Sequence, residues 1–213
     1  MTTNLKGKRI LITAGPTWVP IDAVRVISNT ATGETGILLA DDFARRGAQV
    51  TLILGPVGKG CKNKSVKVIN FKFFNELSSL LKSELKKKRY DIIIHSAAVS
   101  DYGLANKASG IPKKINSGLK ILRLNLKATP KIIDSLRKIS PDSLLIGFKF
   151  EPDLKGANLI KKTNQLIKRA KLDLAVANSV YAKGYLAYLV AAKKHYGPFF
   201  SKKDMAKNLV RLI

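Results

Sequence analysis

The chain has 213 residues, enough for one domain with a buried core, and its apolar (46%) and charged (25%) fractions are those of globular proteins. These fractions exclude a disordered or collagen-like chain, and no apolar run approaches the roughly 18 residues that a bilayer-spanning helix needs. Lys and Arg (39) exceed Asp and Glu (14) by a net charge of +25, which favours anionic partners such as nucleic acid, anionic lipid or phosphorylated metabolites.

Cysteine usage and the N-terminal sequence narrow the class further. Cys61 is the only cysteine, so the chain can form no internal disulfide and no zinc cluster. The N-terminal sequence MTTNLKGKR lacks the apolar core of a secretory signal. We therefore expect a cytoplasmic protein that has no membrane partner.

Continuous apolar runs predict strands that are buried on both faces of a sheet. The first run is RILITAG (9–15), which ends at the first glycine–proline pair. Further runs of this kind cover residues 50–54, 91–95, 144–147 and 172–177, and a shorter one near the C-terminus covers 186–192.

Between these runs, apolar residues recur at helical spacing. Over residues 33–47, Gly36, Ala40 and Phe43 share one helix face, and Gly47 is suited to end the helix. We expect further helices over residues 74–88, 130–139, 153–171 and 201–213. The alternation of strands and helices predicts a Rossmann-like α/β fold, a mostly parallel sheet with helices on both faces, in a single domain over residues 1–213.

In such a sheet, ligands bind outside the carboxyl ends of the strands. The loops expected at these ends are 14–36, 96–118, 148–153 and 178–183. The first two are far longer than the usual connection of about two to six residues, which favours a functional role. Residues 119–126 alternate apolar and polar side chains with one break, and we interpret them as an extended arm or an edge strand.

Several familiar motifs are absent. The first predicted strand is followed by AGPT (14–17) rather than G-x-G-x-x-G, and no tyrosine has a lysine four residues later. The segment GPVGKG (55–60) falls short of a P-loop, and we interpret it as a glycine-rich turn between strands. His95 and His195 are the only histidines, and we interpret His95, at the end of a buried strand, as a core residue.

The polar residues that remain gather at the predicted strand ends. The first long loop carries Asp22, Arg25, Ser28 and Asn29, and residues 32–36 open a helix whose N-terminus is suited to an anion. Each of these side chains alone has an ordinary explanation as a turn or cap residue. Their convergence on one sheet edge predicts a nucleotide site.

The later strand ends add complementary groups. In SAAVSD (96–101), small residues let backbone amides approach a ligand, and Asp101 is suited to bond a ribose hydroxyl. Lys113 and Lys114 are suited to neutralise a polyphosphate. Phe148 follows another predicted strand and can stack on a base.

Taken together, these segments resemble the synthetase domain of the phosphopantothenate–cysteine ligase (phosphopantothenoylcysteine synthetase) family. The resemblance covers nearly the whole chain, and AGPT followed by PID-x-VR-x-ISN is its most specific part. In family order it is carried by RILITAGPT (9–17), PIDAVRVISN (20–29), residues 33–36, RRGAQVTLILG (45–55), AAVSDY (97–102), ATPKII (128–133), residues 147–148, DLAVAN (173–178) and the closing SKKDMAKNLVRLI (201–213).

The resemblance implies a ligase of coenzyme A biosynthesis that joins 4′-phosphopantothenate to L-cysteine. The nucleoside triphosphate, CTP in preference to ATP, is attacked by the substrate carboxylate, releasing pyrophosphate and leaving an acyl-nucleotide. The amine of cysteine then displaces the nucleoside monophosphate. Mg²⁺ is expected and a flavin is not, because no flavin-dependent decarboxylase domain is recognisable in these 213 residues.

Site residues also follow from the resemblance. It gives Asn29 the role of handling the acyl-nucleotide and Arg25 that of organising the loop or meeting phosphopantothenate. Lys114 is the family's essential lysine when a short loop shift is allowed; a gap-free alignment places Ile111 there instead. The nucleotide-binding positions that the resemblance assigns are His95, Ser96, Ala97, Asp101, Lys114, Lys127, Ala128, Thr129, Pro130 and Phe148.

Two departures concern the charges that meet the triphosphate. A cation in the family's Ser-Ser-Gly-Lys-x-Gly motif is Glu34 here. Two further lysines of bacterial members fall on Leu166 and Ala170, so neighbouring lysines are expected to substitute, and Lys168 is the one assigned to the nucleotide. Lys161 and Lys171 are alternatives, and Lys161 shares a helix face with Lys168.

The family is dimeric, so the resemblance implies a homodimer in which residues 119–126 reach the partner. A flavin-dependent decarboxylase, fused or separate, is a further implied partner. Two other classes compete with the ligase. One is a Rossmann-type oxidoreductase, disfavoured by the missing motifs; the other is a basic nucleic-acid-binding protein, although the lysines are spread along predicted helices.

Overall fold

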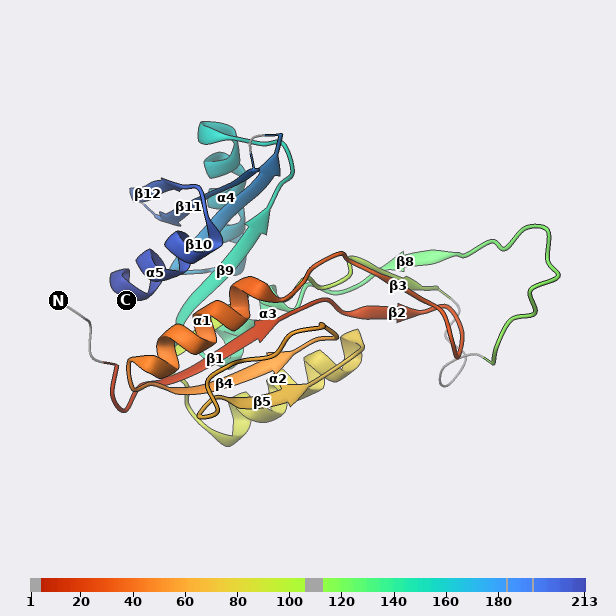
Figure 1. Cartoon of the computed structure of the whole chain (residues 1–213), viewed down its shortest axis with the longest axis horizontal. Helices are drawn as coiled ribbons and strands as arrows, with labels where there is room; N and C mark the ends of the chain where they lie inside the picture. Colours follow the sequence, from red (N-terminus) through yellow and green to blue (C-terminus); the bar gives the residue numbers. More distant parts are fainter. Residues whose placement is uncertain (1–4, 106–112, 183, 193) are drawn as a thin grey trace.

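The computed structural model describes residues 5–105, 113–182, 184–192 and 194–213 of the chain. An eight-stranded sheet forms its centre (Figure 1). Its strands are β1 (Arg9–Ala14), β4 (Gln49–Leu54), β5 (Lys67–Asn70), β6 (Ile92–His95), β9 (Leu144–Phe150), β10 (Leu174–Tyr181), β11 (Gly184–Ala191) and β12 (Lys194–Phe199). They lie in the order β12-β11-β10-β9-β6-β1-β4-β5. The six strands β5, β4, β1, β6, β9 and β10 pair in parallel, whereas β11 and β12 pair antiparallel at the other edge of the sheet.

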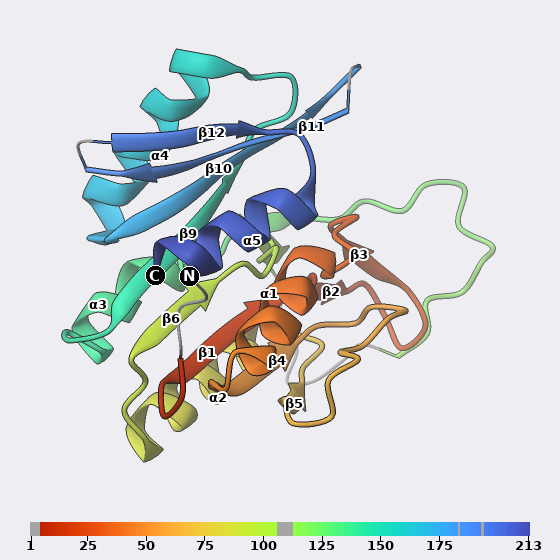
Figure 2. The ribbon, with the colours of Figure 1, turned by 60° about the vertical axis from the view of Figure 1, so that its left-hand side comes forward.

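Helices cover both faces of this sheet. They are α1 (Glu34–Arg45), α2 (Phe74–Lys87), α3 (Ile133–Ile139), α4 (Gly156–Ala170) and α5 (Lys202–Leu212). The buried side chains of α1 and α5 share one apolar cluster, and those of α2, α3 and α4 share a second, on the opposite face (Figure 2). The predicted mostly parallel sheet with helices on both faces is confirmed.

The sequence of β1 explains why this strand lies at the centre. Ile10 and Ile12 belong to the cluster beneath α1, whereas Leu11 between them belongs to the cluster beneath α2. Alternate side chains of a strand point to opposite faces, so only a continuous apolar run can satisfy both layers. Gly36 lets α1 approach the end of this strand, since a Cβ there would lie 2.4 Å from the Cβ of Ala14.

Two edge strands were missed by the apolar-run criterion. β5 and β12 are exposed along most of their length, with burial patterns in which few side chains meet the core. Edge strands gain their pairing from one neighbour only, so they need no continuous apolar run. The interpretation of residues 55–60 as a turn between strands is confirmed, because they connect β4 to β5.

Two small ribbons stand beyond the carboxyl edge of the sheet. β2 (Trp18–Pro20) pairs with β3 (Val26–Ser28), and β7 (Tyr102–Leu104) pairs with β8 (Leu126–Ala128). The chain that leads into β8 projects away from the body (Figure 1). It contains no strand from residue 113 to residue 125, and Leu126 begins β8, so the segment predicted at 119–126 is not an edge strand of the central sheet. Its predicted role as an arm that reaches a partner stays a prediction. Its apolar side chains Leu119 and Ile121 are exposed.

The helices also bear on the question of a membrane. Among the residues that the structure describes, no helix combines the length and the apolar character that crossing a bilayer requires.

Candidate functional site

A cavity of about 640 Å³ lies at the carboxyl edge of the sheet, which we call the edge cavity. It is bordered by the ends of β1, β6, β9 and β10, by the loop that enters α1, and by the start of α5. It brings together the predicted residues Asn29, Ser96, Ala97, Asp101 and Phe148. These side chains come from three separate segments of the sequence, two loops and the strand β9, and the structure brings them together as predicted.

The floor of the edge cavity is made by two loops that bond to each other. The amide of Ala98 donates to the carbonyl of Gly15 (2.9 Å), and the amide of Thr17 donates to the carbonyl of Ala98 (3.2 Å). The hydroxyl of Ser96 donates to the carbonyl of Thr13 (2.6 Å). The small residues after β6 are therefore held against the end of β1 by their backbones, which leaves room above them for a ligand.

Asn29 occupies the junction of the edge cavity with two adjoining hollows, one of which has a volume of about 1390 Å³. The side-chain amide of Asn29 donates to the carbonyl of Ala98 (3.0 Å). This bond fixes an exposed polar side chain between the first long loop and the floor. Asn29 is thus placed to contact a ligand that extends from one hollow into the next.

The loop that enters α1 ends in a left-handed glycine. Gly33 has φ of 72° and, as the residue before the first helical position, offers no side chain to the amides of the first turn. Glycine adopts this conformation without strain, and uncapped amides at a helix N-terminus attract anions. Glu34, the departure from the family pattern, forms an ion pair with Lys202 at 2.5 Å.

His95 lies below the edge cavity rather than in its lining. Its ring is buried, with Nδ1 2.8 Å from the hydroxyl oxygen of Thr13. Burial disfavours the charged imidazolium and lowers the pKa of His95 to about 4. The structure supports the interpretation of His95 as a neutral core histidine; its assignment to the nucleotide stays a prediction that has no lining contact behind it.

Arg25 joins the first long loop to the second; the two roles predicted for it stay predictions. Its guanidinium bonds the buried carboxylate of Asp22 (2.6 Å) and the carbonyl of Ile115 (2.6 Å). The same carboxylate accepts the amide of Ile115 (3.0 Å), and these donors hold the pKa of Asp22 well below its usual range. Lys114, next to Ile115, is exposed and outside the lining of the edge cavity, and so is Lys113. Ile111 lies outside the described residues.

The predicted stretch from Lys127 to Pro130 runs beside the edge cavity. Lys127 and Ala128 belong to β8, and the hydroxyl of Thr129 donates to the carbonyl of Ser100 (2.6 Å). The residue that follows this stretch, Lys131, forms an ion pair with Asp101. The segment thus supports the loop that holds Asp101, while Phe148 lines the edge cavity directly from β9.

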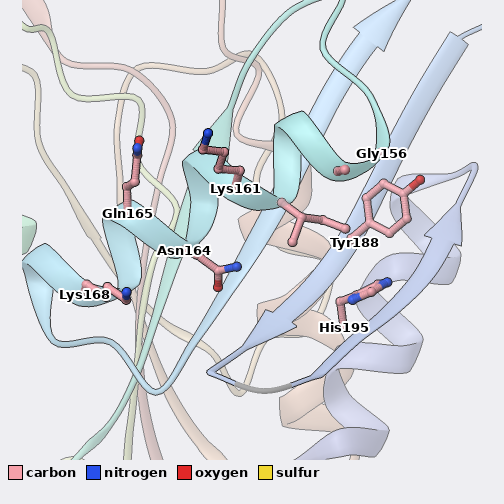
Figure 3. A pocket seen from close by; sticks show the side chains of 9 residues that line it. Gly156, Lys161, Asn164, Gln165, Lys168, Tyr188 and His195 are labelled. Atoms are coloured by element: carbon pink, nitrogen blue, oxygen red, sulfur yellow. The ribbon is translucent and has the colours of Figure 1, made fainter.

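Lys168 lies elsewhere. It lines a groove of about 620 Å³ between α4 and the antiparallel strands, which we call the α4 groove (Figure 3). Lys161 lines the same groove, as the helical spacing predicts, together with Asn164, Tyr188 and His195. The residues described as lining this groove include none that line the edge cavity. Leu166 and Ala170 are buried against the sheet.

The structure adds residues that the sequence did not single out. Asn178 on β10, Tyr185 on β11 and Lys202 on α5 all line the edge cavity. Asn178 and Lys202 lie in segments that carry the family resemblance, which was the signal available for them. Tyr185 follows a hairpin turn, and nothing local in the sequence marks it as a site residue.

Mg²⁺ has a limited set of protein ligands here. Among the described residues, no group of three His, Cys, Asp or Glu side chains could hold a metal ion. The edge cavity offers the carboxylates of Glu34 and Asp101. Since Mg²⁺ in nucleotide sites is held by one or two carboxylates together with phosphates, this donor set fits an ion that arrives with a nucleotide.

A mostly parallel sheet covered by helices, with a polar, glycine-bordered cavity at its carboxyl edge, places the chain in the Rossmann-like α/β class. The family model described as DNA/pantothenate metabolism flavoprotein C-terminal domain matches residues 5–213. The chain therefore belongs to this family.

Individual relatives agree with that assignment. The chain is 40% identical, over 85% of its length, to the coenzyme A biosynthesis bifunctional protein CoaBC of Thermococcus kodakarensis, and the match covers 43% of that relative. The chain thus spans less than half of the length of this relative. Two crystal structures resemble it: the DNA/pantothenate metabolism flavoprotein of Streptococcus pneumoniae (TM-score 0.84, 26% identity, 97% and 98% of the two chains) and the C-terminal domain of a CoaBC (0.79, 25%, 99% and 96%).

Proposed function

We propose that this chain is a phosphopantothenate–cysteine ligase that acts in coenzyme A biosynthesis, in the cytoplasm. The observation that carries the proposal is the edge cavity, in which Asn29, Asp101 and Phe148 meet the glycine-rich start of α1. The names of the relatives support the pathway. The separation of the cavity into adjoining hollows suits a reaction that must hold a nucleotide and a second substrate at once.

The first step activates a carboxylate. A carboxylate oxygen of 4′-phosphopantothenate attacks the α-phosphorus of CTP, the bond to the β-phosphate breaks, and pyrophosphate leaves. Phe148 is placed to stack on the base and Asp101 to accept a hydrogen bond from the ribose. Mg²⁺ would bind the phosphates, with Asp101 as the carboxylate that the cavity lining offers to it, and would offset the charge of two anions brought together. We prefer CTP to ATP as co-substrate, following the family resemblance.

The second step forms the amide. The nitrogen of cysteine attacks the acyl carbon, the carbon–oxygen bond to the phosphate breaks, and CMP leaves while the amine gives up its extra proton. Asn29 can donate to the acyl-nucleotide from its position between the hollows, in keeping with the role predicted for it. Lys114 is the cation proposed to meet the triphosphate.

The position of Lys114 supports a homodimer. The arm that begins near this residue exposes Leu119, Ile121 and Leu122, an apolar surface suited to a second copy of the chain. In a dimer, the arm can bring Lys114 to the edge cavity of the partner. A flavin-dependent decarboxylase that makes the next conversion remains the further partner we propose.

The direct test mixes the chain with 4′-phosphopantothenate, Mg²⁺ and each nucleoside triphosphate in turn, with and without cysteine. We expect pyrophosphate and phosphopantothenoylcysteine in equal amounts when cysteine is present, with CTP the best co-substrate. Light scattering of the same sample tests the homodimer. Absence of pyrophosphate with every nucleotide would overturn the proposed reaction.

A further inference from the structure

The ion pair between Glu34 and Lys202 joins two distant parts of the chain at one border of the edge cavity. Glu34 is the first residue of α1 and Lys202 the first residue of α5, and their charged atoms lie 2.5 Å apart. Both side chains line the edge cavity. Of the residues that the structure describes there, Lys149 is the other lysine in the lining, and it pairs with Glu151.

Glu34 stands where a helix attracts anions. Gly33 gives no side-chain cap, and the amide of Glu34 donates to the hydroxyl of Thr32 at 3.4 Å. The amides of Thr35 and Gly36, which also line the edge cavity, present a partial positive charge there. A carboxylate in the first turn offsets that charge, and the ammonium of Lys202 adds to it. The start of α1 and Lys202 together make a cationic corner that Glu34 neutralises while no ligand is present.

Two buried polar atoms at the same cavity point independently to a ligand. The hydroxyl of Tyr185 and the side-chain oxygen of Asn178 are buried without a hydrogen-bond partner among the described residues. Buried polar groups are almost always paired, so these two atoms call for a partner, which a ligand or water in the edge cavity beside them would supply. Burial and the charge of Glu34 raise the pKa of Tyr185, which keeps its hydroxyl protonated and able to donate.

We propose that Lys202 binds a phosphate of the nucleotide and that Glu34 is a built-in counterion which this phosphate displaces. The proposal deepens the proposed function and rests on it, since it names a phosphate ligand of the same site. The resemblance places a lysine at position 34, where this chain has Glu34. The proposal replaces that lysine's positive charge with Lys202, so the charge comes from α5 instead of α1.

The exchange is feasible because the pair is weakly held. Its side chains are 55% (Glu34) and 35% (Lys202) exposed, and exposed ion pairs contribute little to stability. A triphosphate carries several negative charges and competes well with one carboxylate for the same ammonium. Glu34 also lines the adjoining hollow of about 1390 Å³, so the displaced carboxylate has space away from the phosphate.

The test measures CTP and cytidine affinity by calorimetry at fixed ionic strength with Mg²⁺ present. The matched variants are Lys202→Gln and Lys203→Gln, which remove the same charge from neighbouring positions; Lys203 is exposed and outside the cavity lining. We expect Lys202→Gln to weaken CTP binding about tenfold and Lys203→Gln to change it by less than about twofold. Cytidine, which has no phosphate, should bind all three proteins alike.

Glu34→Gln tests the counterion. It removes a competitor and a repulsive charge, so CTP should bind about threefold more tightly, and this gain should shrink when Lys202→Gln is also present. Equal CTP affinity in Lys202→Gln and Lys203→Gln would overturn the inference while leaving the ligase intact. No binding of any nucleoside triphosphate by the unaltered protein would instead overturn the proposed function. Equal losses of CTP and cytidine binding in Lys202→Gln would assign Lys202 a structural role only.

Discussion

The edge cavity and the α4 groove have nearly equal volumes, about 640 and 620 Å³, yet they differ in how they are built. The edge cavity draws on β1, β6, β9, β10, β11 and α5 and the loops between them, whereas the α4 groove is lined by α4 and two antiparallel strands. Parallel strands bring their carboxyl ends to one edge, so distant segments converge there. Volume therefore does not distinguish the proposed site from the α4 groove, whereas the convergence of distant segments does.

The two regions also carry similar side chains, which makes the comparison testable. The edge region has Asn29, His95, Phe148 and Lys202, and the groove has Asn164, His195, Tyr188 and Lys168. We expect that substituting the edge member of a pair changes nucleotide chemistry or stability, and that substituting its counterpart in the groove does not.

The largest effect is expected at the asparagines. Asn29→Asp replaces an amide donor with a carboxylate that repels the carbonyl of Ala98 and an anionic intermediate. Product formation should fall about a hundred- to a thousandfold while pyrophosphate is still released, a loss typical of removing one essential donor. Mass spectrometry of the product and a pyrophosphate assay separate the steps. Asn164→Asp is the control, and equal product formation by the two variants would break the comparison.

The histidines should differ in how stability depends on pH. The pKa of His95 is about 4 in the folded protein against 6.5 unfolded, so between these values the unfolded chain binds the proton more tightly. The free energy of unfolding should therefore fall by about 3 kcal/mol as the pH drops from about 6.5 to 4. Urea titrations of His95→Gln should lack this slope, whereas the exposed His195→Gln should keep it. An unchanged slope in His95→Gln would contradict the assignment.

The aromatic pair tests base stacking. Phe148→Ala removes the ring from the edge cavity and should raise the dissociation constant of CTP about tenfold, because base–aromatic stacking contributes about 1–3 kcal/mol. Tyr188→Ala in the groove is the matched variant and should bind CTP like the unaltered protein. A greater loss with Tyr188→Ala would move the base to the groove.

The smallest effect is expected for Lys168→Gln. Its side chain is exposed in the α4 groove, so only a screened long-range attraction is lost, and CTP affinity should change less than about twofold. A tenfold loss at this position would instead restore the nucleotide contact that the sequence predicts for Lys168.

The sequence predicts the centre of the fold better than its margins. β1 and β6 pack against an apolar layer on each face of the sheet. Residues 10–14 and 92–95 are therefore buried, and they form continuous, mostly apolar runs that can be recognised in the sequence. β5 and β12 are mostly exposed and form no such run. The sequence predicts that Phe148 follows a strand ending at residue 147, but it lies inside β9, which continues to Phe150. Asn29 lies in the predicted long loop, directly after β3.

The contacts that the sequence could not predict join residues far apart along the chain. The pair of Glu34 with Lys202 spans 168 positions, and the bond from Arg25 to Ile115 spans 90. Such partners are chosen by the packing of α5 on α1 and by the path of the arm, neither of which is encoded in local periodicity. The family resemblance indicates which residues belong to the family's motifs, whereas the tertiary structure shows which of these residues are in contact.

The bonds that Asp22 and Arg25 make to Ile115 have a consequence for the energetics of ligand capture. They fix the backbone one residue away from Lys114, and they link that lysine to the ribbon of β2 and β3 that leads to Asn29. A lysine on a free loop must lose backbone entropy whenever it contacts a ligand. Here most of that ordering is completed when the chain folds, so the phosphate contact proposed for Lys114 would cost mainly the freedom of its own side chain.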